Sequence, residues 1–172
     1  PIFSHADIDG NPLVDRKGHQ IFQVLAARVD LQAACANTYA TAFLLYLDSH
    51  LRRDTLDLVT LLIDVRPGYG WPNLPALQML GFIRCLAQVL HDSHPCRLHQ
   101  CILFPVPRPA ILIWKTVQNF LDPLVRKSIV LIPGAANLTS PVPRDRLKDY
   151  CDDAAGLDLM EQTRLEAFCK KE

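Results

Sequence analysis

The chain has no excess of charge of either sign, because eighteen Lys and Arg side chains balance eighteen Asp and Glu side chains. A neutral protein has no global field that recruits nucleic acid or an anionic bilayer, so we expect no nucleic-acid partner and only local headgroup contacts. Long hydrophobic runs are also missing: none approaches the ~20 residues that span a bilayer, and the start has no signal-peptide pattern. The chain begins Pro-Ile-Phe without Met, so we expect it to be a piece of a longer protein.

The motifs that enzymes use for nucleophilic or nucleotide chemistry are missing too. Neither G-x-S-x-G nor G-x-x-x-x-G-K-[ST] occurs. Gly68 and Gly70 follow an apolar run, as in a dinucleotide-binding fingerprint, but Asn73 stands where the third Gly belongs. A tight turn before a helix explains this segment better. We therefore expect no catalytic residues, no cofactor and no enzymatic activity.

Cysteine is too sparse for a disulfide scaffold: six residues, at positions 35, 85, 96, 101, 151 and 169, in a chain of 172. Cys35 and Cys85 lie in apolar segments typical of buried helices. Cysteines of this kind are typical of reducing compartments, so we expect a cytoplasmic location.

A concentration of possible zinc ligands lies between the second predicted helix and the strand that follows it. It consists of His91, His94, Cys96, His99 and Cys101. Zinc sites usually combine two ligands at short spacing with two more at a distance, and this sequence has no second pair of that kind. A solvated loop is the simpler interpretation, so we assign no metal ligand.

Hydrophobic periodicity predicts strands and helices in alternation. Runs of strand character lie at 19–30, 56–65, 100–104 and 128–132, helical patterns at 31–53, 74–92 and 108–121, and two shorter helices at 142–155 and 160–171. Asp30 is expected to cap the first helix. Strands that alternate with helices of crossover length indicate an α/β fold with a parallel or mixed sheet.

The predicted helix over 109–121 is unusually hydrophobic. Leu112 and Ile113 make it apolar nearly all round, so one buried face does not use up its apolar surface. A stripe on one side consists of Ile111, Trp114, Val117, Phe120 and Leu121. Prolines at 105, 107, 109 and 123 bracket the helix and can delimit a unit that moves as a body. A helix packed permanently on the sheet is the alternative interpretation.

These segments resemble the CRAL-TRIO (Sec14-like) lipid-binding domain. HPCRL at 94–98 stands where that family has Y-P-E-R-L, and ILFPVP at 102–107 where an apolar strand ends N-A-P. QNFLDP at 118–123 is similar to the family's K-P-F-L-D-P, and Ser128-Ile129 follows at the next strand. Upstream, DRKG at 15–18 is similar to the family's D-K-D-G-R-P, and LLIDVRPG at 61–68 to its strand ending D-L-x-G. The resemblance spans roughly residues 15–132 in the right order and spacing.

The resemblance implies a sheet that floors an apolar pocket closed by a mobile gate helix, here 109–121. Such domains bind one hydrophobic molecule and exchange it at a membrane surface. The expected partners are therefore a phospholipid, sterol or isoprenoid-like ligand and a membrane. The residues expected to line the pocket come from two strands, a turn and the gate helix: Ile63, Val65, Tyr69, Ile102, Phe104, Ile111, Trp114, Val117, Phe120 and Leu121.

Two departures from the family pattern concern the lipid headgroup. Members that bind phosphatidylinositol carry a Glu and a Lys at the positions of Cys96 and Ser128 here, so the resemblance does not carry that headgroup site over. Lys115, with Arg126 and Lys127, forms a basic cluster beside apolar residues, and we expect it to dock on the membrane.

The sequence predicts an N-terminal segment 1–18, a lipid-binding domain 19–155 and a C-terminal helix 156–172. The leading hypothesis is non-catalytic binding, with intermembrane transfer, of a hydrophobic molecule by a cytoplasmic protein that associates peripherally with membranes. The alternative is a protein-interaction or membrane-targeting module of a larger regulatory protein, with possible protein partners, that has lost lipid exchange.

Overall fold

A computed structural model describes residues 2–51, 55, 57–120, 123–151 and 154–166. Within them, the chain builds a sheet whose strands are ordered β1-β2-β3-β4-β5. The strands are β1 Phe3–Ser4, β2 Gln20–Leu25, β3 Val59–Asp64, β4 Leu98–Val106 and β5 Ile129–Pro133. β1 pairs antiparallel with β2, and the other neighbouring pairs are parallel. The predicted α/β fold with a mixed sheet is confirmed.

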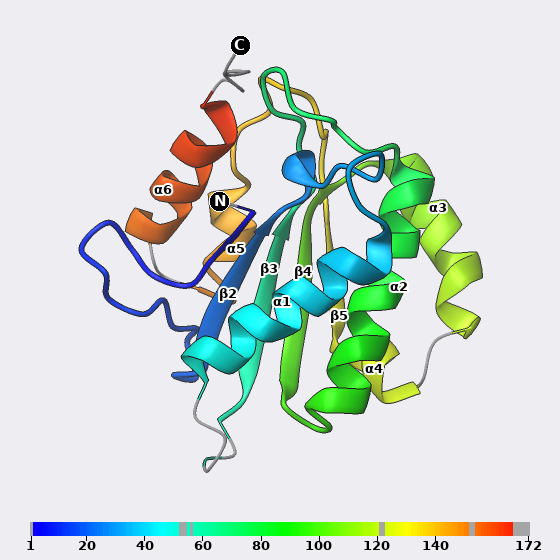
Figure 1. The fold of residues 1–172 in the computed structure, drawn as a ribbon. Helices are drawn as coiled ribbons and strands as arrows, with labels where there is room; N and C mark the ends of the chain where they lie inside the picture. The colour runs from blue at the N-terminus through cyan, green and yellow to red at the C-terminus, as the bar shows by residue number, and fades with distance from the viewer. Residues whose placement is uncertain (1, 52–54, 56, 121–122, 152–153, 167–172) are drawn as a thin grey trace.

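Helices cover both faces of the sheet (Figure 1). They are α1 Ala36–His50, α2 Ala76–Ser93, α3 Arg108–Val117, α4 Pro123–Ser128, α5 Arg144–Leu147 and α6 Ala154–Leu165, with short 3-10 turns η1 Ala26–Arg28 and η2 Gln118–Phe120. Because spatial strand order follows chain order, right-handed crossovers place their helices on one face. α1, α2 and α3 accordingly lie on one side, and α5 and α6 on the other.

Strand β3 is buried along its whole length, which fits a strand covered on both faces. Its side chains alternate between two cores. Leu61 and Ile63 pack in the first core with side chains of α1 and α2, whereas Leu62 packs in the second core with Leu147 and Met160. We use these two names below: the first core lies under α1–α3 and the second under α5 and α6.

Several predicted helix boundaries differ from those of the structure. Helix α1 begins at Ala36 rather than after Asp30, because the Asp30 carboxylate accepts the amide of Gln32 and closes a separate turn. Within the helix predicted over 142–155, the described residues form two separate helical stretches, α5 at Arg144–Leu147 and the first residues of α6 from Ala154.

The last helix starts earlier than the sequence indicates, at Ala154 instead of residue 160. Gly156 lowers helix propensity there. Packing outweighs it, because Leu157 and Met160 fill the second core and the Gly156 carbonyl accepts a hydrogen bond from Gln23. Residues 167–171 of this prediction lie outside the described part of the chain.

A buried ionic network joins the end of β3 to α6. Arg66 donates to both carboxylate oxygens of Asp64, with Nη2 2.6 Å from Oδ2, and also lies 2.6 Å from Glu161. Arg164 donates to Glu161 at 2.8 Å and to the carbonyl oxygens of Pro67 and Leu138. Asp64, Arg66 and Arg164 are at most 1% exposed. The network therefore fixes α6 to the sheet through charge-assisted hydrogen bonds.

The cysteines differ in environment, which predicts their order of alkylation. Burial raises the pKa of the Cys101 thiol to about 12, whereas a hydrogen bond with the Thr38 hydroxyl lowers the pKa of exposed Cys35. Because the thiolate is the nucleophile, iodoacetamide at neutral pH should modify Cys35 at least ~100-fold faster than Cys101. Peptide mass spectrometry over a time course measures both rates. In urea the two rates should converge, and equal rates in the folded protein would contradict this assignment.

Candidate functional site

An apolar cavity of about 280 Å³ lies at the carboxyl ends of the parallel strands. This is the edge at which open α/β sheets usually bind ligands. The cavity is lined by Ala26, Ala27, Val65, Arg66, Pro67, Asn73, Leu74, Met79, Ile83, Leu103, Val106, Pro107, Ala110, Ile113, Trp114, Leu131 and Ala136. Most of these side chains are hydrocarbon or aromatic, so the cavity suits an apolar ligand.

Helix α3 forms one wall of the cavity. Ala110, Ile113 and Trp114 line it, and Trp114 is only 9% exposed. Leu112, on the same helix, points away and is 65% exposed. The helix begins after Pro107, with no side-chain hydrogen bond at its N-cap. The sequence favours helix here because a proline near the first turn has a backbone already set for it.

The two most polar residues of the lining already have partners. The Asn73 side chain accepts the Gly68 amide at 2.8 Å and donates to the Gly68 carbonyl at 3.0 Å. The Arg66 guanidinium binds Asp64 and Glu161 and donates to the Ser140 carbonyl. These hydrogen bonds satisfy the polar groups within the fold, so what the wall offers a ligand is mainly hydrocarbon contact.

The residues predicted to contact the ligand are spread over several environments. Val65 and Trp114 line the cavity. Ile63 is fully buried in the first core, and partly buried Ile111 packs against that core. Tyr69 is 50% exposed. For Val117, Phe120 and Leu121, side-chain positions lie outside what the structure describes.

Ile102 and Phe104 occupy the opposite face of the sheet, in the second core. Successive side chains of a strand point to opposite faces of the sheet. Assigning the cavity-facing residues of a strand one position too early or too late therefore places them on the other face. Leu103 and Val106 of the same strand line the cavity instead. The sequence ILFPV at 102–106 predicts a strand whose side chains alternate between two faces. It does not indicate which of the two faces lines the cavity.

Other residues that line the cavity were not among the predicted ligand contacts, although the sequence pattern identifies the helices that carry them. Met79 and Ile83 belong to the apolar stripe of α2, which the sequence identifies as buried without indicating that part of it borders a cavity. Ala110 and Ile113 lie on the helix singled out above.

The basic residues expected to dock on a membrane are all exposed. Lys115 lies on α3 and Arg126 and Lys127 lie on α4, the short helix that precedes β5. Leu112 is exposed on the helix that carries Lys115.

The histidines and cysteines between 91 and 101 do not converge on one point. His94 Nε2 lies 2.9 Å from Asp48, and Cys101 is buried in the first core. His99 instead lies beside His19, from a distant part of the sequence.

An open α/β sheet with an apolar cavity at its carboxyl edge is an arrangement that suits a hydrophobic ligand. The sequence of residues 11–152 matches the family described as the CRAL/TRIO domain, and the chain belongs to that family. The family in general binds lipids or other hydrophobic ligands without catalysis. A search of curated proteins found no match. Along the described helices, no stretch is both long and apolar enough to cross a bilayer.

Proposed function

We propose that this chain binds one lipid or similar hydrophobic molecule in the cavity beneath α3 and exchanges it at a membrane surface. The observation that carries the proposal is a cavity of about 280 Å³ with hydrocarbon walls, in which Arg66 and Asn73 are bonded within the fold. Each methylene transferred from water contributes about 0.8 kcal/mol, so eight of them supply roughly 6 kcal/mol before the cost of ordering the ligand.

Titration with a fluorescent fatty acid tests this proposal directly. We expect saturable binding of one molecule, with quenching of Trp114 fluorescence as the ligand fills the cavity. A competing unlabelled lipid should reverse both signals. Non-saturable partitioning of the probe would count against a defined site.

Helix α3 acts as the gate in this proposal. The cavity volume is just below the ~300–1,000 Å³ of typical small-molecule sites, so a two-chain lipid needs more room than the closed form provides. Movement of α3 about the proline-rich segment before it would enlarge the cavity. Exposed Leu112 then meets the bilayer while Trp114 follows the ligand. The lipid headgroup then lies near the opening of the cavity. Cys96 and Ser128 stand where the phosphatidylinositol-binding members have Glu and Lys, so this pair does not hold a phosphatidylinositol headgroup.

The cluster formed by Lys115, Arg126 and Lys127 orients the gate toward anionic lipid. Near an anionic bilayer each basic residue contributes about 1 kcal/mol, so replacing all three with Glu should weaken binding to phosphatidylserine vesicles by at least 100-fold. Binding to neutral vesicles should hardly change. Vesicle sedimentation over a salt series measures both affinities.

A matched control places the same charge change elsewhere on the surface. Lys17, Arg84 and Lys148 are also exposed, and their triple replacement with Glu should reduce binding to anionic vesicles much less. Equal losses for both triple variants would show that net charge, rather than this face, governs the interaction.

A further inference from the structure

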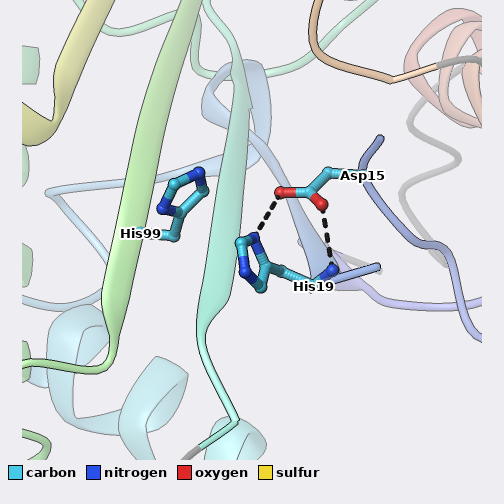
Figure 2. Close-up of side chains that lie close together, drawn as sticks. All are labelled: Asp15, His19 and His99. Carbon is cyan, nitrogen blue, oxygen red and sulfur yellow. Dashed lines mark hydrogen bonds and ion pairs between the residues drawn. The ribbon is translucent and has the colours of Figure 1, made fainter. Parts of the chain in front are cut away.

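Asp15, His19 and His99 lie close together (Figure 2). They lie at the amino ends of the parallel strands, whereas the cavity lies at the carboxyl ends. Asp15 and His19 flank the turn that leads into β2, and His99 lies at the start of β4. One possible ligand atom from each residue lies within 4.8 Å of the others, and the two imidazole rings are 4.3 Å apart. From His99 to the cavity-lining Val106 the strand extends about 23 Å, at ~3.3 Å per residue.

The carboxylate of Asp15 is held in place by groups around it. Its Oδ1 accepts the backbone amides of Lys17 at 2.8 Å and His19 at 2.9 Å, and its Oδ2 accepts the Thr60 hydroxyl at 2.7 Å. Asp15 is 8% exposed. In metal sites, hydrogen bonds from surrounding groups orient the carboxylates that bind the ion.

The two imidazoles supply nitrogen donors. His19 Nδ1 lies 3.0 Å from Asp15 Oδ2, which Figure 2 shows as a dashed line, and the His99 ring faces the same pair across β3. For the His99 ring nitrogens, no hydrogen-bond partner is found among the residues that the structure describes. A half-buried imidazole without such a partner has a lone pair available to a ligand.

We propose that Asp15, His19 and His99 bind one divalent transition-metal ion with zinc-like ligand preferences. Imidazole nitrogen suits zinc and related ions, and two His with one carboxylate is a three-ligand set that leaves a fourth position open. Tetrahedral zinc–nitrogen and zinc–oxygen bonds of 2.0–2.2 Å place ligand atoms about 3.3 Å apart. The ligand atoms now lie within 4.8 Å of one another, so binding requires them to approach by up to about 1.5 Å, through rotation of the imidazole side chains. The ion connects the turn before β2 to β4, across β3.

Calorimetric titration of chelator-treated protein with zinc chloride tests the site. We expect one ion per chain, and a rise in the thermal transition with zinc because the ion binds the folded state. His99→Asn should weaken zinc binding at least tenfold while leaving the transition of the metal-free protein unchanged, because His99 does not hold the Asp15 turn. The matched control is His91→Asn, at an exposed position on α2, which should bind zinc as the unmodified chain does.

Cobalt spectroscopy separates this site from the exposed cysteines. Cobalt bound by Asp15, His19 and His99 should show visible d–d bands without thiolate charge-transfer absorption in the near ultraviolet. Charge-transfer bands, the absence of zinc binding to the unmodified chain, or equal affinities of the His99→Asn variant and the unmodified chain would each overturn the proposal.

Discussion

Replacing Trp114 with Asp should weaken fatty-acid binding at least tenfold while the thermal transition stays largely in place. Trp114 is 9% exposed and lines the cavity, so the substitution removes a large apolar contact and introduces a carboxylate. Because burying that charge without a partner would cost several kcal/mol, the Asp carboxylate should stay hydrated, which keeps water in the cavity and excludes an acyl chain. Fluorescent fatty-acid titration and thermal denaturation measure the two effects.

Leu112→Asp is the matched control on the same helix. Leu112 is 65% exposed and points away from the cavity, so this variant should bind the free fatty acid normally. A second variant, Ala110→Trp, fills the cavity without adding charge and should also lose binding. If Trp114→Asp unfolds the protein, α3 is a fixed part of the core and the gate assignment is wrong.

Replacing Asp64 with Asn should lower the free energy of unfolding by about 3–5 kcal/mol, the usual effect of removing one partner from a buried ion pair. The Asp64 carboxylate is completely buried and binds Arg66 through both oxygens. The amide leaves the Arg66 guanidinium with less charge compensation in the same buried place. Urea denaturation measures the change, and α6 should lose protection from hydrogen exchange first because the network fixes it.

Asp158→Asn provides the control for this prediction. Asp158 pairs with Arg144 on the surface, where both side chains are substantially exposed. Such pairs contribute about 0–1 kcal/mol, so the loss should be small. A loss below 1 kcal/mol for Asp64→Asn as well would mean that the buried network does not fix α6.

The sequence was most informative where a pattern is local. The run at 56–65 predicts a strand covered on both sides, and β3 is buried throughout. The helices over 74–92 and 108–121 were also found, with ends shifted by a few residues. Their period and length are properties of neighbouring residues, which a sequence displays directly.

The parts that could not be predicted depend on contacts between distant residues. Nothing local distinguishes Leu103, which lines the cavity, from Ile102, which faces the other core. Arg66 meets Glu161, and His19 meets His99, only because the sheet brings them together. Helix α6 likewise includes Gly156, which lowers local helix propensity. The helix forms there because Leu157 and Met160 pack in the second core.

Native mass spectrometry of the protein, purified without detergent and incubated with liposomes, tests the central claim most directly. The account predicts one added hydrophobic molecule per chain, recoverable by solvent extraction, and only the bare mass for Ala110→Trp. Bare mass for the unmodified chain, before and after liposome contact, would contradict lipid binding and favour an interaction module that retains the fold alone.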